Sequence, residues 1–249
     1  GGGSPIMRVW SITDTGLVRK ENQDAYFVEE MADCLVAAVC DGMGGPGGGR
    51  EASAIAVQTM RTELPKALHP GMSAQQLGQA FGYCAGMAND AIRARAAQEP
   101  ALLHMGTTLV AAAARPELAV VTNIGDSRAY LISREGIRQI SKDHSLVENM
   151  VDHGELTPQQ ARKHPSRNLI TRALGPEAAV QADTFPVQWK QGDFLLLCSD
   201  GLVNTVTDQE ILFEVIHGGA LEECLQRLLA LSRQRGAPDN VTAILLMNI

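Results

Sequence analysis

Five aspartates stand at or near the ends of apolar, strand-like runs, next to residues that form turns. Aspartate is depleted in strands, so an apolar run that delivers a carboxylate at its end needs an explanation. One explanation is conformational, because Asp caps tight turns through bonds to its own backbone. If the runs instead meet at one sheet edge, the carboxylates would repel one another unless cations neutralise them. The five residues are Asp24, Asp41, Asp126, Asp200 and Asp239.

The ligand type indicates which metal such a site would hold. Oxygen ligands without accompanying His or Cys select magnesium or manganese over zinc or copper. The six histidines show no H-E-x-x-H or similar spacing, which favours the same metals. Two such ions can hold a bridging hydroxide, lower its pKa and neutralise the oxygens of a phosphoryl group. The sequence therefore predicts phosphoryl chemistry at a two-metal carboxylate site.

An arginine lies close to the first of these aspartates. Arg19 stands five residues before Asp24, in the run VRKEN. A guanidinium at this position could hold two phosphate oxygens bidentately. The simpler interpretation is an exposed arginine in a polar turn.

A glycine-rich stretch, DGMGGPGGGREAS, begins at Asp41 and lies between a predicted strand and a predicted helix. Gly42, Gly44 and Gly47 match the G-x-G-x-x-G fingerprint of dinucleotide sites. That fingerprint requires an acidic residue about 20 positions on, at the end of a second strand. Glu63 is near that distance but falls inside a predicted helix. No Gly-Lys-Ser/Thr follows, which excludes a triphosphate loop, so we expect the glycines to turn the backbone sharply and bring a carbonyl against a cation.

The composition bounds the class of protein. The 249 residues carry a formal charge of −7 with no run of like charge, so binding to nucleic acid or to an anionic membrane is not expected. With 45% apolar residues we expect one domain with a buried core. The five cysteines form no C-x-x-C pair, which is typical of a reduced, cytoplasmic chain. No signal-peptide core or membrane-spanning run is visible, and we interpret residues 1–6 as a linker or expression scar.

The elements that must position the aspartates fall into blocks. Strands are predicted at 7–16, 24–30 and 34–40, followed by long alanine-rich helices at about 51–68 and 73–98.

Next come three strand-like runs, TTLVAAAAR, LAVVTNIGDSRAYLIS and IRQIS, which predict an antiparallel meander. Residues 145–180 are polar with short helical pieces, as in a flap, and a buried strand then ends near Asp200. Two helices over 208–235 and the strand NVTAILLMN complete the chain. Segregated blocks of this kind favour an α+β layered sandwich over a parallel doubly wound sheet.

Eight motifs resemble, in order and spacing, the metal-dependent protein phosphatases, the type 2C Ser/Thr phosphatases, in their compact bacterial form. The match runs from about Arg8 to the C-terminus. It implies a four-layer α-β-β-α sandwich with two central antiparallel sheets and a binuclear metal site at one edge. It also implies a single catalytic domain over 7–249, with a flap subdomain at about 145–170 that influences substrate choice. The motifs are VRKENQDAY, VCDGMGGPGGGREAS, GTTLVAA, NIGDSRAYLI, SKDHSLV, NLITRALG, LLLCSDGL and DNVTAI.

The resemblance implies roles for the metal ligands. Asp41 would bridge two Mn²⁺ or Mg²⁺ ions, and the carbonyl of Gly42 would complete the shell of one. Asp200 and Asp239 would bind the first ion. Asp24 would hold the second, partly through water.

Further roles follow from the same motifs. Asp126 matches a position that helps to bind a third, weaker ion in bacterial members, and Arg19 matches the arginine that holds the substrate phosphate. The chain departs from the family pattern in the glycine loop. Met43 stands where eukaryotic members carry a histidine proposed as general acid, and Pro46 and Arg50 stand where many bacterial relatives have His and Glu.

These residues together predict a protein phosphatase with Arg19 and Asp41 as its catalytic residues. It would hydrolyse phosphothreonine and phosphoserine by direct attack of a metal-bridging hydroxide. Its partners would be phosphorylated proteins and a eukaryotic-like Ser/Thr kinase whose action it reverses. No nucleic-acid partner and no membrane insertion are expected.

Other mechanisms and classes fit less well. None of the five cysteines has Arg six positions later, which excludes a cysteine-dependent phosphatase. A two-metal phosphodiesterase or nuclease would use similar carboxylates, but the chain lacks a basic stripe. A catalytically silent phosphoprotein-binding regulatory module on the same fold is the remaining alternative, and loss of a metal aspartate would be its signature.

Overall fold

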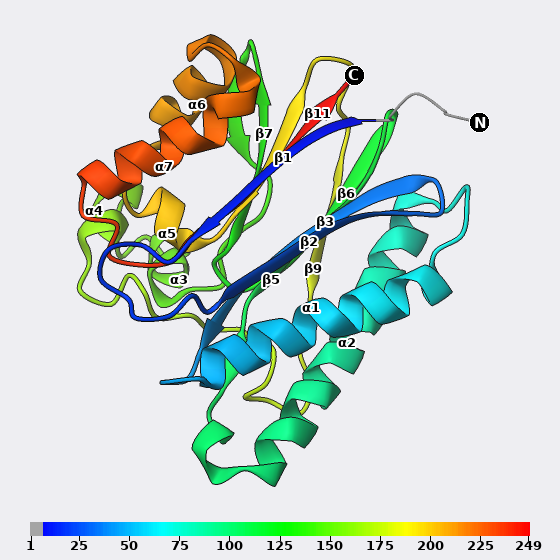
Figure 1. Cartoon of the computed structure of the whole chain (residues 1–249), viewed down its shortest axis with the longest axis vertical. Helices are drawn as coiled ribbons and strands as arrows, with labels where there is room; N and C mark the ends of the chain where they lie inside the picture. Colours follow the sequence, from blue (N-terminus) through cyan, green and yellow to red (C-terminus); the bar gives the residue numbers. More distant parts are fainter. Residues whose placement is uncertain (1–6) are drawn as a thin grey trace.

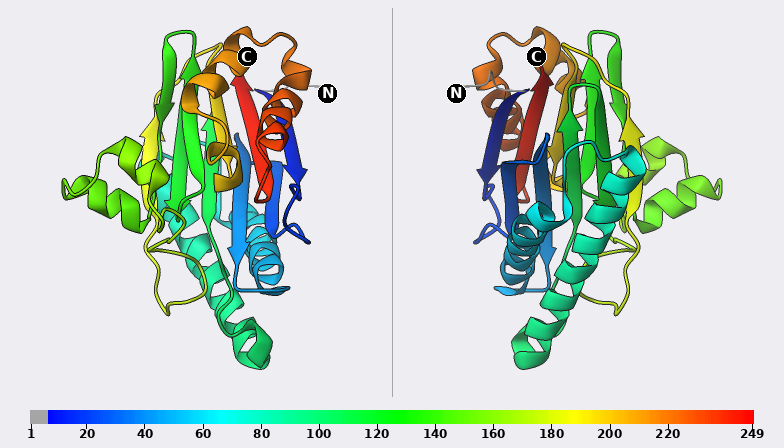
Figure 2. Two further views of the ribbon diagram at one scale, coloured as in Figure 1. Left: turned by 90° about the vertical axis from the view of Figure 1, so that its left-hand side faces the viewer. Right: turned by 90° about the vertical axis from the view of Figure 1, so that its right-hand side faces the viewer.

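Two antiparallel sheets pack face to face, and helices cover the outer side of each (Figures 1 and 2). The computed structural model describes residues 7–249, so the predicted linker at residues 1–6 lies outside the described residues. The order of the layers is helix, sheet, sheet and helix, which confirms the predicted four-layer α+β sandwich. Of the described residues, no helix is both long and apolar enough to cross a membrane.

The first sheet has five strands and contains both ends of the described chain. Its outer strand β1 pairs antiparallel with the last strand, β11, with Met7 opposite Asn248. The order across the sheet is β1 (Met7–Asp14), β11 (Val241–Asn248), β10 (Phe194–Cys198), β7 (Arg128–Ser133) and β8 (Gly136–Gln139).

The second sheet is built around the two longest apolar runs near the start of the chain. Its main path is β2 (Asp24–Met31), β3 (Cys34–Met43), β5 (Leu109–Arg115), β6 (Leu118–Ile124) and β9 (Asp183–Val187). A two-residue strand, β4 (Gly106–Thr107), pairs with the end of β3. The pairing of β4 extends β3 beyond Asp41 to Met43, so Asp41 lies inside the strand and not at its last position.

Three apolar layers hold the four structural layers together. Between the sheets, small and branched side chains from β3 and β10 interlock, among them Ala37, Val39, Leu195 and Leu197. Many of the inner positions of the second sheet are alanine, which lets the two sheets approach closely.

The helices over the second sheet are α1 (Gly48–Ala67) and α2 (Ala74–Gln98). Helix α1 buries Ala52, Ala56, Met60 and Leu64, one residue per turn, against this sheet. Helix α2 begins with a capping box, in which Ser73 accepts from the N–H of Gln76 and the Gln76 side chain accepts from the N–H of Ser73.

The helices over the first sheet come from the C-terminal part of the chain. They are α5 (Asp200–Val203), α6 (Asp208–His217) and α7 (Cys224–Gln234). Helices α6 and α7 pack their apolar faces against β10 and β11. Short 3-10 turns lie at Pro100–Leu102 and Leu221–Glu223.

The predicted flap forms two short helices, α3 (Leu146–Asp152) and α4 (Pro158–Lys163), which project from the side of the sandwich (Figure 2). Its two ends come back together at the sandwich. The N–H of Leu146 donates to the carbonyl of Leu169 at 3.0 Å, and Ser145 pairs with Ile170.

The predicted meander is wrong at residues 118–133. The sequence predicts one strand over this run, but the chain leaves the second sheet after β6 and enters the first sheet as β7. Gly125, with φ of +109°, makes the turn between them. The change of sheet places Asp126 at the boundary between the sheets. Strand β9 was not predicted, because its exposed positions and Pro186 do not resemble a buried strand.

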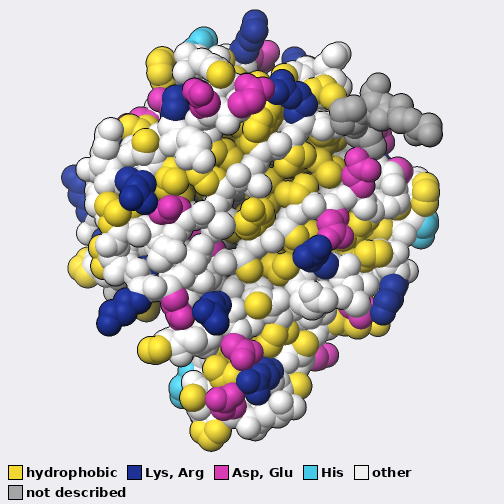
Figure 3. All heavy atoms as spheres, in the orientation of Figure 1, with side chains coloured by type: hydrophobic (Ala, Val, Ile, Leu, Met, Phe, Trp, Pro, Cys, Tyr) yellow, Lys and Arg dark blue, Asp and Glu magenta, His cyan; other side chains and the backbone are white. Residues whose placement is uncertain are grey.

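The cysteines lie in the interior, and charges of both signs are mixed on one face of the molecule. All five cysteines are free and buried, as expected for small apolar residues. On the face shown in Figure 3, basic and acidic side chains are interspersed around a band of hydrophobic ones. Neither sign of charge forms a continuous area on that face.

Candidate metal centre

The aspartates meet at one end of the sandwich because both sheets end there. Asp24 opens β2 and lies opposite Asp41 of β3 in the antiparallel register. Asp200 follows β10 in the other sheet, and Asp239 lies two residues before β11. One carboxylate oxygen from each of Asp41, Asp200 and Asp239 lies within 4.8 Å of the others. Four carboxylates from two sheets thus converge as the sequence predicts.

The unpaired oxygens of this cluster fit divalent cations. Oδ1 of Asp24 and Oδ1 of Asp200 are buried and have no hydrogen-bond partner within residues 7–249. The other oxygen of Asp24 accepts from the hydroxyl of Thr242 at 2.6 Å. Buried acceptors without a donor are costly unless a cation binds them. An oxygen-only donor set of this kind suits manganese or magnesium.

The electrostatics of the cluster lead to the same conclusion. Burial raises the pKa of Asp24 to about 6. Burial also raises the pKa of Asp41 well above its ordinary value, and the charges of Asp24 and Asp200 add to the shift. Burial raises the pKa of Asp200 as well. The ionised cluster is therefore unfavourable by itself, and cations would relieve it.

Asp126 lies beside the cluster, on the turn between β6 and β7. Its side chain is buried and lines the same cleft as Asp41 and Asp200. Burial raises its pKa, with the charges of Asp200 and Asp143 as further causes. The structure therefore brings all five predicted aspartates to one end of the sandwich.

Two glycines after Asp41 allow a close backbone contact that was not predicted from the sequence. A Cβ on Gly42 would lie 1.9 Å from the carbonyl oxygen of Gly49, at the start of α1. A Cβ on Gly49 would in turn lie 2.7 Å from the carbonyl carbon of Gly42. The two backbones therefore touch, which fixes the end of β3 against α1. The predicted sharp turn lies between them, where Gly45 and Gly47 have positive φ.

Arg19 reaches the cluster from an exposed loop. Its Nε lies 3.4 Å from Oδ1 of Asp239, and its side chain is 58% exposed. It lines a cleft of about 690 Å³ together with Met43, Pro46 and four of the five aspartates, Asp41, Asp126, Asp200 and Asp239. Arg50 is exposed on the first turn of α1.

Two further residues hold the site together and were not predicted as part of it. The buried side chain of Asn240 accepts from the N–H of Gln23 at 3.0 Å and donates to the carbonyls of Thr15 and Glu21. It therefore ties the loop that carries Arg19 to the start of β11.

Thr108 supports the ligands from inside the sandwich. Its hydroxyl oxygen accepts from the N–H of Asp41 at 2.9 Å and lies 2.7 Å from the hydroxyl of Ser127, beside Asp126. The signals for these two residues are their places in the motifs GTT and DNVT.

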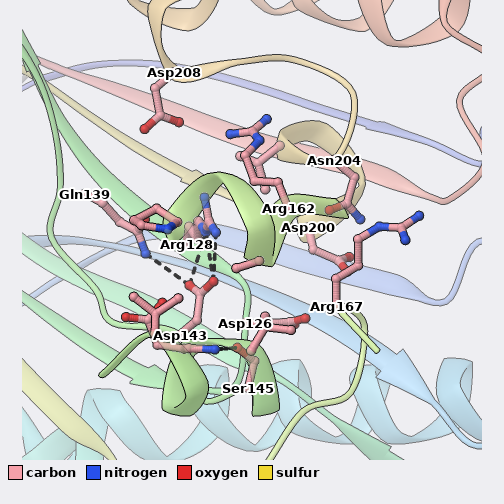
Figure 4. A pocket seen from close by; sticks show the side chains of 16 residues that line it. Asp126, Arg128, Gln139, Asp143, Ser145, Arg162, Arg167, Asp200, Asn204 and Asp208 are labelled. Carbon is pink, nitrogen blue, oxygen red and sulfur yellow. Dashed lines mark hydrogen bonds and ion pairs between the residues drawn. The ribbon is translucent and has the colours of Figure 1, made fainter. Parts of the chain in front are cut away.

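A second pocket, of about 310 Å³, opens between the flap and the sandwich next to the aspartates (Figure 4). Asp126 and Asp200 line both spaces, so the pocket continues from the metal centre. On its inner wall Asp143 accepts hydrogen bonds from Arg128 and Gln139.

A family model described as Protein phosphatase 2C matches residues 18–245. The chain belongs to the protein phosphatase 2C family. This confirms the predicted family and the class of enzyme, so the chain is a protein phosphatase, a hydrolase.

Relatives and solved structures agree with this assignment. Serine/threonine phosphatase stp of Listeria innocua is 36% identical over 234 residues, which are 94% of this phosphatase and 92% of that protein. The crystal structure of serine/threonine phosphatase Stp1 from Staphylococcus aureus matches with a TM-score of 0.90 and 32% identity, over 98% of this chain and 95% of that one. The catalytic domain of PstP, crystallised with two manganese ions, matches with a TM-score of 0.83 and 34% identity over 97% of each chain.

Proposed function

We propose that this type 2C phosphatase hydrolyses phosphothreonine and phosphoserine in proteins with two Mn²⁺ or Mg²⁺ ions. The observation that carries the proposal is the convergence of Asp41, Asp200 and Asp239 with unpaired, buried oxygens on Asp24 and Asp200. The manganese ions in the PstP structure support the choice of metal.

The placement of the side chains supports the ligand roles that the family resemblance implies. Asp41 pairs with Asp24 in the second sheet and has a carboxylate oxygen within 4.8 Å of oxygens of Asp200 and Asp239, so we assign it to both ions. Asp200 and Asp239 come from the first sheet and would hold one ion, with the carbonyl of Gly42. Asp24 would hold the other, partly through water. The bound ions would supply an activated hydroxide and neutralise the phosphoryl oxygens.

The chain's own residues would orient the substrate and set the site's geometry. Arg19, exposed at the mouth of the cleft, would bind two phosphate oxygens bidentately and release its contact with Asp239 on doing so. Asp126 would bind a third, weaker ion. The phosphoryl group would transfer directly to water, which releases phosphate and the free serine or threonine hydroxyl, without a phosphorylated enzyme residue.

The rest of the proposal concerns the organisation of the protein and its setting. Residues 7–249 would form a single catalytic domain, with the flap at about 145–170 contributing to substrate choice. A eukaryotic-like Ser/Thr kinase in the cytoplasm would supply the phosphorylated proteins. The names of the Listeria and PstP relatives support this class of substrate.

The silent regulatory module is the less favoured alternative. All five aspartates are present, four of them line one cleft and Asp24 pairs with Asp41 beside it, whereas a silent module would tolerate their loss.

The test is phosphate release from a phosphothreonine peptide. Turnover should require Mn²⁺ or Mg²⁺, stop with EDTA, and fall by at least about 100-fold in Asp239→Asn. Asp90→Asn, on the exposed face of α2, is the matched control and should keep full activity. In H₂¹⁸O, a single turnover should place solvent oxygen in the released phosphate. A trapped phosphoenzyme would refute direct hydrolysis, and a folded, metal-bound protein without turnover would favour the silent module.

A further inference from the structure

His144 holds the loop that presents Asp126. This histidine is buried, with 7% of its surface exposed, and lies immediately before the flap. Its Nδ1 accepts a hydrogen bond from the N–H of Gly125 at 3.0 Å. Its own N–H donates to the carbonyl of Gly125 at 2.9 Å. One residue therefore binds both polar groups of the glycine that precedes Asp126.

The contacts of the ring define where its proton lies. A backbone N–H can only donate, so Nδ1 of His144 acts as acceptor and the ring proton lies on Nε2. Nε2 then donates to Oδ2 of Asp183, at 2.7 Å. Oδ1 of Asp183 accepts from Arg172 at 3.2 Å. The carboxylate thus orients the imidazole, and the arginine orients the carboxylate.

The same histidine also receives the returning end of the flap. Its carbonyl accepts from the N–H of Thr171 at 2.9 Å. Arg172, the next residue, reaches the ring through Asp183. A displacement of the flap's base would therefore move His144 and, through its hydrogen bonds, Gly125.

The loop is confined on its other side as well. A Cβ on Gly125 would lie 2.7 Å from Cγ2 of Thr108, and the hydroxyl of Thr108 lies 2.7 Å from that of Ser127. The turn that carries Asp126 is thus held between Thr108 and His144. Removal of either contact would leave one side of the turn without support.

We propose that His144 is a positioning residue that holds Asp126 in the metal centre and links it to the base of the flap. The inference rests on the proposed function, because it takes Asp126 to be a ligand of the third, weaker ion. It assigns to His144 no contact with substrate or with the ions.

Two substitutions separate the contacts of the ring. The side chain of His144→Asn can place an acceptor near the position of Nδ1, and so keeps the bond from Gly125. The side chain of His144→Gln reaches the position of Nε2, and so keeps the contact with Asp183 but leaves the buried N–H of Gly125 without an acceptor. His164→Gln is the matched control, because His164 also accepts a backbone N–H through Nδ1, from Ser166, but within the flap.

The experiment is a calorimetric titration of the purified proteins with Mn²⁺ alone. We expect His144→Gln to bind the weak ion about tenfold less tightly, the effect of leaving one buried N–H unsatisfied near the ligand. The two tight ions should keep their affinity. His144→Asn and His164→Gln should stay within about twofold of the wild type. In the Asp126→Asn background, His144→Gln should cause no further loss, because both changes act through one carboxylate.

Several results would overturn the inference. It fails if His144→Gln binds the weak ion as the wild type does, or if all three ions weaken together as in general loss of structure. Failure of the wild type itself to bind an ion that depends on Asp126 would overturn the role proposed for Asp126 too, which separates the two failures. Should His144→Gln not fold, Asp183→Ala removes the ring's orienting partner, and the weak ion should then bind about threefold less tightly. Unchanged binding in that variant would also refute the inference.

Discussion

Replacing Gly42 with alanine tests whether the close contact between β3 and α1 shapes the metal centre. The added Cβ would lie 1.9 Å from the oxygen and 2.4 Å from the carbon of the Gly49 carbonyl. Carbon atoms normally stay about 3.5 Å from such neighbours, so the two segments would have to separate by more than about 1 Å. Both are backbone, so no side-chain rotation can relieve the overlap.

The magnitude follows from what the separation breaks. Overpacking in a well-packed interior costs about 1–3 kcal/mol. Here the hydrogen bond from the N–H of Gly42 to the carbonyl of Gln23, at 3.0 Å, would also weaken, for about 1 kcal/mol more. We expect Gly42→Ala to lower the free energy of unfolding by about 3 kcal/mol. Because Asp41 is the preceding residue, manganese-dependent kcat/KM should fall about 100-fold.

Urea unfolding in EDTA measures the first effect, and phosphopeptide turnover with Mn²⁺ measures the second. Gly45→Ala is the control within the loop. Among residues 7–249, no atom outside its chain neighbours would lie within 4 Å of the added Cβ, so only the positive φ opposes the change, at a cost of about 1–2 kcal/mol. Gly86→Ala, in an open position of α2, should stabilise the protein by about 1 kcal/mol. If Gly42→Ala loses no more stability than Gly45→Ala, the contact with Gly49 does not exclude a side chain.

Further expectations concern the substrate arginine, the support of Asp41, acid stability and metal removal. Arg19→Ala should raise the KM for a phosphopeptide about tenfold, in steady-state assays at saturating Mn²⁺, and unchanged KM would refute its phosphate contact. Thr108→Val leaves the N–H of Asp41 unpaired and should lower the free energy of unfolding by about 1–3 kcal/mol in urea titrations, whereas an unchanged midpoint would contradict that role. The hydrogen bond from Arg235 lowers the pKa of Glu210 from 4.5 to about 2. The wild type should therefore have a higher free energy of unfolding than Glu210→Gln above about pH 4.5, and this difference should vanish as the pH falls towards 2. This difference, below about 1 kcal/mol because the pair is exposed, can be followed by urea titration, and a difference that persists at pH 2 would contradict its electrostatic origin. Free Mn²⁺ at 100 times the dissociation constant should raise the free energy of unfolding by about 2.7 kcal/mol per site. If EDTA does not change the melting temperature of the Mn²⁺-loaded protein, the metal does not bind to the folded state.

The grouping of the aspartates could be predicted because its signal is local. Asp200 and Asp239 stand beside strands that are apolar at almost every position, and several aspartates placed in this way favour a shared cation site over separate turn caps. The two sheets then need only end at one edge for the aspartates to meet. The helices were also well predicted, because alanine and leucine recur in them at helical spacing.

The change of sheet after β6 could not be predicted in the same way. Residues 118–133 carry strand-forming residues on both sides of Gly125, and nothing local shows that the two parts belong to different sheets. Whether such a run stays in one sheet depends on packing against residues far away in the chain. The roles of Asn240 and Thr108 escaped prediction for a similar reason, since their partners lie 217 and 67 residues away.

The pairing of β1 with β11 has a consequence for labelling the protein. Met7 and Asn248 lie opposite one another at one end of the first sheet, and Asp239 lies beyond the other end of β11. Seven steps along that strand, at about 3.3 Å each, put roughly 23 Å between Asn248 and the strand's first residue. A fluorescent reporter fused at Met7 or at Asn248 would thus lie far from the cleft. Because the two positions are neighbours, a short tether could also join them in a circularly permuted variant whose new ends lie elsewhere.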